Sequence, residues 1–384
     1  MKKIVFIAVI LSVIILTGCF NDLANGPLEE NRPDELYNKP YADLSVEEAD
    51  FQKVNPFEGI NSREKSIYGA GEGKILIRSD KLYLFDVKDQ TIVAEAPLKR
   101  LELPTYYTTK SGYWIVGTEV MEDQRITKAY FYNENLDIIQ EFNLTEILGP
   151  SPRTIAISQS GKKIAYATNN GLFLYDLTEE TKQSLFNLGL ENIEVNEGLV
   201  SFRDITFFDN DTKLAFMGTS FEENDMNGQT TFGIISIDGS VVFNEKALLP
   251  RLQHMGVSDD YLAFSEGLYP FGTGAPVGEV IMIDNATQQI IRHTLMDKDE
   301  GSNIFLSEKG KYFMTYLQKG SSEIIYKIYD SKTGDLIQEM EQKFFGEAAE
   351  NYMRTYIEIF DDSHTFIAVS TFYEAEPVVA IHEF

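Results

Sequence analysis

The chain has 384 residues and carries 60 Asp and Glu against 33 Lys and Arg, which gives a formal net charge of −27. Its apolar share of 43% is that of a folded globular protein and far above that of a disordered acidic tail. The acidity argues against a nucleic-acid partner, because neutralising phosphates requires a basic surface. A single cysteine leaves no room for an internal disulfide or a cysteine-based zinc cluster.

The N-terminus has the layout of a secretory signal. Lys2 and Lys3 precede an apolar or small stretch over residues 4–16, which is too short to span a bilayer comfortably. The following segment, Leu16-Thr17-Gly18-Cys19, resembles the bacterial lipobox, in which small residues precede a cysteine that is lipidated and becomes the new N-terminus. We therefore predict a signal peptide over residues 1–18 and a lipid on Cys19 that anchors the folded part outside the cytoplasmic membrane. The alternative is an uncleaved anchor helix with an incidental cysteine.

Residues 19–50 are rich in Asn, Asp, Glu and Pro and show no sustained periodicity. This composition predicts a hydrated, lipidated tether. Loss of the signal peptide removes two lysines and changes the net charge to −29. The acidic side chains of the tether are then repelled by anionic lipid headgroups. For residues 36–46, an arm packed on the domain is an equally good alternative.

A unit of about fifty residues recurs over the rest of the chain. It consists of a strand, a tight turn with Gly, Asp or Ser, and a second strand, followed by another hairpin. The turn anchors are Gly112, Gly161, Asp211, Asp260, Gly310 and Asp362, at intervals of 49, 50, 49, 50 and 52 residues. Four strands in each unit of this length are typical of a β-propeller blade.

These repeats predict an all-β domain over residues 51–384, a β-propeller of seven four-stranded blades. Residues 64–98 supply the four strands of the first blade, whereas the last unit, over 356–384, supplies only three. An incomplete blade leaves exposed strand edges, so we expect residues 51–60 to add the missing outer strand and to close the ring with the C-terminal strands. Six or eight blades and a long β-helix are the alternatives.

One hairpin carries a resemblance to a known family. The segment ISQSGKKIAYAT is similar to the Ser-Pro-Asp-Gly-Lys-x-Ile-Ala-Tyr hairpin of TolB-type, WD-repeat-like propellers. The matching residues are Ser158, Gly161, Lys162, Ile164, Ala165 and Tyr166, while Gln159 and Ser160 replace Pro-Asp. The Trp-Asp dipeptide of true WD repeats is absent. The resemblance implies a propeller architecture and leaves the activity open.

Arginines recur at one repeat position, eight residues upstream of the turn anchors. In a propeller, the loops that lead into the innermost strands converge on one face around the central channel, which we call the mouth face. The arginines at or beside this position are Arg63, Arg153, Arg203, Arg251 and Arg354. Such a ring in an acidic protein predicts an anion-binding site, because a guanidinium suits carboxylate or phosphate. The alternative is that each arginine pairs with an acid or a loop carbonyl of a neighbouring blade.

Two long loops, 220–230 and 267–278, join second to third strands and are therefore expected on the same face. Long loops on a rigid scaffold are frequent binding elements. Tyr269 and Phe271, flanked by Gly and Pro, are predicted to be exposed aromatics that suit a protein or sugar partner. The alternative is that these loops pack over the channel.

Catalytic signals are weak. His254, His293, His364 and His382 are scattered and show no metal-ligand spacing, and we expect only His254 near the channel, as a buried and hydrogen-bonded residue. A nucleophile elbow and a phosphate-cradling loop are absent from the sequence. We therefore predict no cofactor and no metal ligand, although residues 225–228 and 297–301 faintly resemble calcium loops.

Three functions follow from these patterns, and the first is a lipid-anchored extracytoplasmic module that binds a protein or an envelope glycan. The second is a hydrolase or lyase that acts on an anionic substrate such as an acidic sugar or a lactone, with Asp204 as the first candidate acid or base. The third is a structural role in envelope assembly, which the TolB resemblance implies. A pocket with two carboxylates of perturbed pKa beside the arginines would favour the enzyme.

Overall fold

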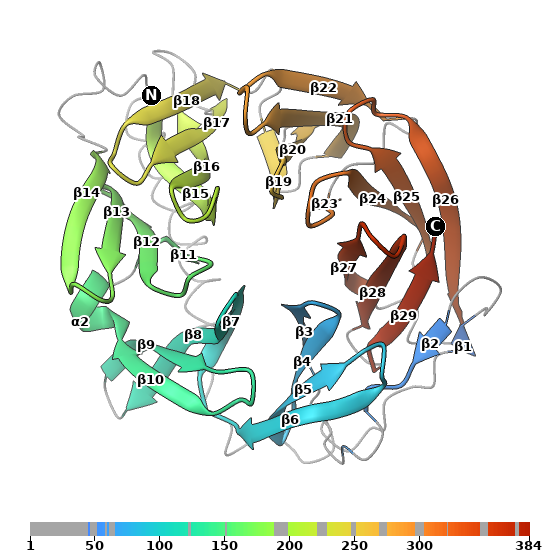
Figure 1. The fold of residues 1–384 in the computed structure, drawn as a ribbon, viewed down its shortest axis with the longest axis horizontal. Coiled ribbons are helices and arrows are strands. Elements are labelled where there is room, and N and C mark those ends of the chain that lie inside the picture. Colours follow the sequence, from blue (N-terminus) through green and yellow to red (C-terminus); the bar gives the residue numbers. More distant parts are fainter. Residues whose placement is uncertain are drawn as a thin grey trace, which may run out of the picture. The chain divides into compact units, whose positions relative to one another are not determined.

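The computed structural model describes residues 45–46, 52–57, 60, 66–121, 124–149, 152–187, 199–220, 229–246, 251–268, 275–295, 303–320, 322–345, 352–372 and 376–384. Residues 42–384 form one compact unit. Within it, the described residues build seven antiparallel sheets, which stand as blades around a central axis (Figure 1). The predicted all-β propeller with seven blades is therefore confirmed. No helix in the described segments has the length and apolarity that a membrane crossing requires.

The first three blades each consist of four consecutive strands, with the first strand innermost. Blade 1 contains β3 (Ser66–Gly71), β4 (Lys74–Arg78), β5 (Lys81–Asp86) and β6 (Thr91–Pro97). Blade 2 contains β7 (Glu102–Thr109), β8 (Gly112–Met121), β9 (Gln124–Tyr132) and β10 (Ile138–Asn143). Blade 3 contains β11 (Thr154–Ile157), β12 (Lys163–Thr168), β13 (Gly171–Asp176) and β14 (Thr181–Asn187). The short helix α2 (Leu144–Leu148), which the sequence analysis did not foresee, joins blades 2 and 3.

The remaining blades follow the same order, and the last two also pair with N-terminal strands. Blade 4 contains β15 (Leu199–Phe208), β16 (Lys213–Ser220), β17 (Gln229–Ser236) and β18 (Val241–Lys246). Blade 5 contains β19 (Arg251–Val257), β20 (Tyr261–Leu268), β21 (Ala275–Asp284) and β22 (Ile290–Thr294). Blade 6 contains β23 (Ile304–Leu306), β24 (Tyr312–Lys319), β25 (Glu323–Asp330) and β26 (Leu336–Phe345). Blade 7 contains β27 (Tyr352–Phe360), β28 (Thr365–Phe372) and β29 (Val378–Glu383).

Burial along the strands follows their place in the blade. The second and third strands are buried on both faces, as in Ile75, Leu76 and Ile77 of β4, because each blade is sandwiched between two others. The fourth strands, such as β14, are largely exposed. In the described residues, seven apolar clusters each join two neighbouring blades. Burial between blades therefore holds the ring together.

The ring closes through its N-terminal segment, as the sequence predicts. β2 (Gln52–Val54) pairs with β29 and supplies the outer strand of blade 7. Val54, Phe57 and Ile60 are buried in the cluster that joins blades 7 and 1. β1 (Ser45–Val46) lies within the segment expected to be a tether and pairs with β26, which makes blade 6 five-stranded.

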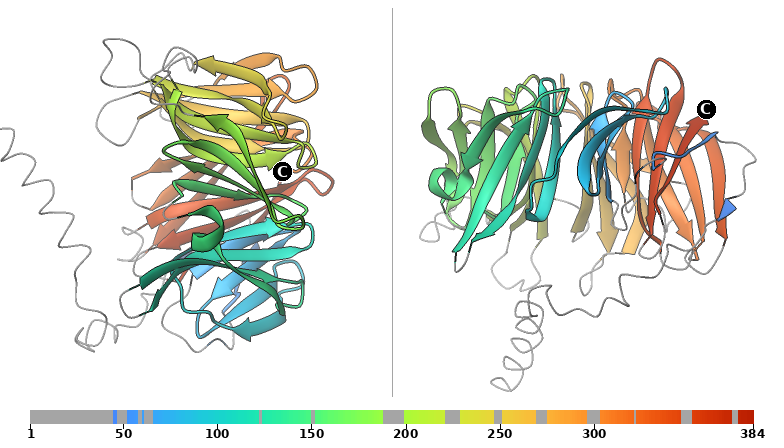
Figure 2. Two further views of the ribbon diagram at one scale, coloured as in Figure 1. Left: turned by 90° about the vertical axis from the view of Figure 1, so that its left-hand side faces the viewer. Right: turned by 90° about the horizontal axis from the view of Figure 1, so that it is seen from below.

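The tight turns after the innermost strands connect neighbouring blades. Four of the six turn anchors have positive φ, namely Gly112 (140°), Gly161 (68°), Asp211 (65°) and Gly310 (84°), and so does Gly71 (74°) at the matching turn of blade 1. This conformation explains why Gly or Asp recurs there. The carboxylate of Asp211 in blade 4 accepts hydrogen bonds from the backbone N–H groups of Gln159 and Ser160 in blade 3, at 2.6 and 2.8 Å. We call this side of the ring the turn face, and in side view the strands run between it and the mouth face (Figure 2).

Candidate functional site

A cavity of about 800 Å³ lies at the central channel, between the innermost strands of blades 2 to 5. It is lined by Leu103, Thr105, Tyr107, Val116, Gly117, Thr118, Thr127, Pro152, Arg153, Thr154, Ile155, Asp204, Ile205, Thr206, Met255 and Val257. Leu103 and Thr105 of β7 and Thr154 and Ile155 of β11 come from the halves of these strands nearest the mouth face. Tyr107 and the lining residues of β15 and β19 lie farther along their strands toward the turn face, so the cavity extends into the channel. The volume is in the range of small-molecule and peptide side-chain sites.

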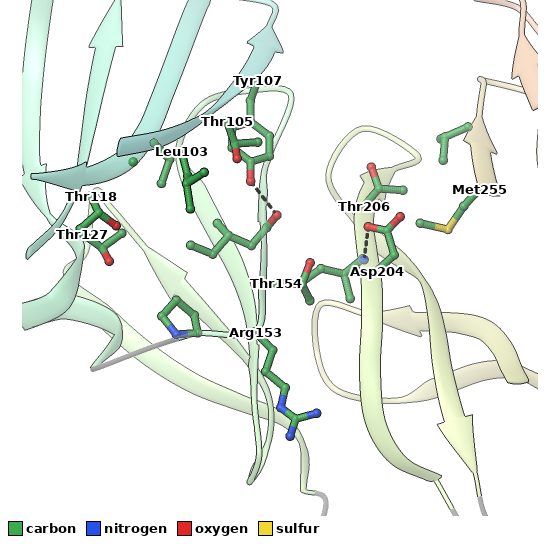
Figure 3. A pocket seen from close by; sticks show the side chains of 16 residues that line it. Leu103, Thr105, Tyr107, Thr118, Thr127, Arg153, Thr154, Asp204, Thr206 and Met255 are labelled. Carbon is green, nitrogen blue, oxygen red and sulfur yellow. Dashed lines mark hydrogen bonds between the residues drawn. The ribbon is translucent and has the colours of Figure 1, made fainter. Parts of the chain in front are cut away.

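Two walls of the cavity stand opposite each other in Figure 3. Leu103, Thr105 and Tyr107 of β7 form one wall, and Asp204 and Thr206 of β15 lie across from them beside Met255 of β19. The hydroxyl of Tyr107 donates to the backbone carbonyl of Ile155 at 3.1 Å, which ties blade 2 to blade 3. Threonine hydroxyls and aliphatic groups thus make up most of the surface that a ligand would contact.

Leu103 stands out in the first wall. The register between β7 and β8 shifts between Glu102 and Thr105, so the ladder is interrupted at Leu103. Its φ is +48°, a conformation that is unfavourable for a branched L-residue, and it is 91% exposed. An apolar side chain held open to solvent by a strained backbone is the kind of feature found at binding sites.

Asp204 carries the acidic group of the opposite wall. A second register shift, between Phe202 and Asp204, leaves Arg203 out of the β15–β16 ladder, while Asp204 itself pairs with Met217. Its Oδ1 accepts a hydrogen bond from the backbone N–H of Ile205 at 2.9 Å. The side chain is accessible from the cavity, yet the surrounding strands withdraw it from bulk water, and this desolvation raises the pKa of Asp204 above its usual value. Burial, with a smaller contribution from the charge of Asp204, raises the pKa of Tyr107 to about 12.

The predicted arginines divide into three groups. Arg153 lines the cavity but extends away from Asp204 (Figure 3), and its Nε donates to Oδ1 of Asn169 at 2.5 Å. Arg203 and Arg354 are exposed on the innermost strands β15 and β27 and are not among the lining residues. Arg251 begins β19, and Arg63 lies outside the described residues. Asn169 lies in the same blade as Arg153, so this contact is neither an anion site nor the alternative pairing with a neighbouring blade.

Several other predicted residues lie outside the described residues: Cys19, Tyr269, Phe271 and the calcium-like segments 225–228 and 297–301. The strands that flank the two long loops are described, and they are the second and third strands of blades 4 and 5, as expected.

The histidines take structural positions. His254 on β19 is partly buried, and its Nδ1 accepts the backbone N–H of Ile304 at 3.4 Å. Burial lowers the pKa of His254, so the ring is neutral near pH 7. His382 is 2% exposed and stacks on Phe366 with ring centroids 4.5 Å apart, and burial lowers its pKa to about 4. His293 is also buried, and its Nε2 lies 3.0 Å from the carbonyl oxygen of Ser331.

The titratable groups of the cavity bear directly on catalysis. Asp204 is the one carboxylate among the lining residues, whereas acid–base hydrolysis uses a pair. Burial raises the pKa of Glu358, on β27, to about 7, but Glu358 is not a lining residue. Its carboxylate accepts hydrogen bonds from the backbone N–H groups of Glu72 and Gly73, which stabilises the contact between blades 7 and 1. The described residues contain no cluster of three or more His, Cys, Asp or Glu side chains suited to a metal ion.

The cavity was only partly visible in the sequence. Asp204 and Arg153 were singled out, but the threonines and Leu103 were not. Threonine is a common strand residue, so it gives no signal of a binding wall. The positive φ of Leu103 depends on a register shift that no local pattern encodes.

Comparison with known proteins shows the fold. No protein-family model matches the chain, and no curated protein is significantly similar to it in sequence. The chain is similar in structure to the WD40 domain of Pan2 from Neurospora crassa, with a TM-score of 0.55, 7% identity, and coverage of 90% of this chain and 98% of that one. It is also similar to hydrazine synthase from Kuenenia stuttgartiensis, with a TM-score of 0.52, 14% identity, and coverage of 92% and 98%. At these identities the likeness shows a WD40-like β-propeller fold and nothing finer.

Proposed function

We propose that this protein is a lipid-anchored, extracytoplasmic binding module that holds a protein or another envelope component at the mouth face of its propeller. The observation that carries the proposal is the cavity of about 800 Å³, which opens among innermost strands of four blades and combines hydroxyl and aliphatic groups. WD40-like propellers are common interaction scaffolds, and a rigid ring with a recessed site suits that role.

The N-terminal sequence supports the anchor. A basic start, a short apolar stretch and the segment ending in Cys19 have the order that lipoprotein processing requires. Because Cys19 is the chain's sole cysteine, the replacement Cys19→Ala removes every site for the lipid. We expect this variant to lose incorporation of labelled fatty acid and to leave the membrane fraction. If Cys19→Ala remained lipid-labelled, the anchor proposal would be wrong.

The register of β1 supports a particular orientation of the anchored domain. β26 is an outer strand that ends at the mouth face, and its last residue, Phe345, pairs with Ser45. The chain that precedes Ser45 therefore joins the propeller at the mouth face. Twenty-five residues separate Cys19 from Ser45, and a random-coil linker of that length would have an r.m.s. end-to-end distance of about 28 Å. In this proposal the mouth face is the side nearer the membrane, so a partner bound there is presented at or close to the lipid surface.

The enzyme hypothesis has less support. The cavity lining supplies one carboxylate from the described residues, Asp204, and the one predicted arginine among the lining residues, Arg153, is bonded to Asn169. A single acid beside threonines and aliphatic groups is sufficient to bind a ligand. A hydrolase of the two-carboxylate type needs a second acid at a matched distance. Binding without chemistry is therefore the function that this geometry supports best.

Filling the cavity tests the proposed function. We expect Thr206→Trp, which places an indole in the channel, to abolish recovery of the partner by chemical cross-linking in membranes followed by affinity purification and mass spectrometry. The control Lys162→Trp adds the same ring at an exposed position on the turn face of blade 3 and should leave recovery unchanged. Urea unfolding of both variants shows that they are folded. Equal recovery with Thr206→Trp and with wild type would place the partner elsewhere.

A further inference from the structure

The cavity holds a carboxylate without a described cationic side chain bonded to it. Asp204 accepts the backbone N–H of Ile205, and among the described residues no ion pair to Asp204 is formed. The charge of Arg203, the preceding residue, lowers the pKa of Asp204, but desolvation raises it by more. The groups that face Asp204 from other strands are Tyr107 from β7 and the apolar Met255 from β19. A ligand cation would therefore complete the charge balance of this wall.

Hydroxyl groups surround that carboxylate. Thr154 and Thr206 lie beside Asp204, and Thr105 lies on the opposite wall (Figure 3). A threonine hydroxyl can accept a hydrogen bond, so this set offers several acceptors around one negative charge. A primary ammonium has three donors in a tetrahedral arrangement, and it fits one carboxylate oxygen together with two hydroxyls.

An aliphatic surface leads to the carboxylate. Leu103 is 91% exposed on the β7 wall, and Met255 lies on the far side of the cavity. Lysine carries its ammonium on a four-carbon stem that gains stability on apolar surfaces. An arginine fits less well, because its planar guanidinium pairs best with both oxygens of a carboxylate, and Oδ1 of Asp204 already accepts the N–H of Ile205.

We propose that the cavity binds a lysine side chain of a protein partner, with its ammonium on Asp204 and its stem against Leu103. The proposal rests on the proposed function and names the chemistry of the partner's contact. Arg153 does not oppose it, because its guanidinium is turned toward Asn169 and away from Asp204. The aliphatic stem separates this ligand from ethanolamine headgroups of the membrane, which present the same ammonium on two carbons.

A blocked hexapeptide with one central lysine among alanines is the probe, titrated into the purified folded domain by calorimetry at low ionic strength. We expect binding that weakens at least about tenfold with Asp204→Asn, equivalent to about 1.4 kcal/mol. Asparagine keeps the shape and the acceptor for the N–H of Ile205, so the fold is preserved. The matched control is Asp260→Asn, at an exposed position on the turn face of blade 5, which should bind as wild type does.

Analogues of the probe separate charge from stem. Nε-acetyllysine and norleucine peptides should lose binding by a similar factor, and free ethanolamine should not compete. Leu103→Ala should weaken binding of the lysine peptide about fourfold, which corresponds to the free energy of burying one methylene group. Undetectable binding of the lysine peptide, equal binding to Asp204→Asn, or equal binding of the acetylated peptide would each overturn the proposal. If Asp204→Asn still captured the membrane partner, the lysine contact would be wrong while the binding function stood.

Discussion

The N-terminal closure should be one of the costliest parts of the propeller to disturb, and Phe57→Ala tests it directly. Phe57 is 6% exposed and packs with Val54 and Ile60 in the cluster between blades 7 and 1. Replacing a buried Phe by Ala costs roughly 3–5 kcal/mol, because the transfer free energy is lost and a cavity remains. That is a large part of the 5–15 kcal/mol that stabilises a typical domain.

The assay is equilibrium urea unfolding of residues 20–384, followed by tryptophan fluorescence of the buried Trp114 and by circular dichroism. We expect the midpoint for Phe57→Ala to fall by about 1 M, since a domain of this size loses at least about 3 kcal/mol of stability per molar urea. Ile139→Ala is the control, because Ile139 is 53% exposed on the outer strand β10 and its loss should change stability by less than about 0.5 kcal/mol. Equal midpoints for Phe57→Ala and wild type would refute the closure by the N-terminal segment.

Three further predictions concern strain, acid sensitivity and orientation. Leu103→Gly should raise the free energy of unfolding by roughly 1 kcal/mol, because glycine adopts a φ of +48° without strain and the lost side chain is 91% exposed. A lower urea midpoint for this variant would show that the backbone at Leu103 is not strained. His382 binds a proton below pH 6.5 in the unfolded state but only near pH 4 in the folded state. The free energy of unfolding should therefore fall by up to about 3 kcal/mol more in wild type than in His382→Phe as the pH drops from 7 to 4. A parallel pH dependence of the two proteins in urea titrations would exclude that residue as the cause. The orientation can be tested by energy transfer from a donor dye on the protein to acceptor-labelled lipid in vesicles. Transfer should be more efficient from a dye on Asn170→Cys, at the mouth-face end of β12, than from one on Lys162→Cys, about 20 Å away at the other end. The reverse order would place the turn face nearer the membrane.

The sequence predicted the repeat because its physical cause is local. A tight turn needs a left-handed residue, so Gly161 and Gly310 mark turns in the sequence and have positive φ in the structure. Strands sandwiched between blades must be apolar on both faces, and this made the second and third strands visible. The closure was predictable from a count of strands, because a blade with three strands leaves an open edge.

The candidate site was less predictable because it depends on register and on contacts between blades. Spacing placed Arg153 and Arg203 near the start of innermost strands, but it could not show that the guanidinium of Arg153 is turned toward Asn169. The irregularities at Leu103 and at Arg203, the neighbour of Asp204, are shifts between paired strands, which single-strand patterns do not encode. β1 lies within the segment 36–46 for which a packed arm was the alternative, but its pairing with β26 could not be predicted, since two residues give no periodicity.

In-cell photo-cross-linking tests the central claim, that the mouth-face cavity holds the partner, most directly. A photoreactive amino acid at Thr105, an exposed residue of the cavity wall, would be compared with the same group at Lys162, which is exposed on the turn face. The account predicts a discrete cross-linked product of higher mass in the membrane fraction from position 105, lost when Asp204→Asn is added, and none from position 162. A product from position 162 with none from position 105 would contradict it.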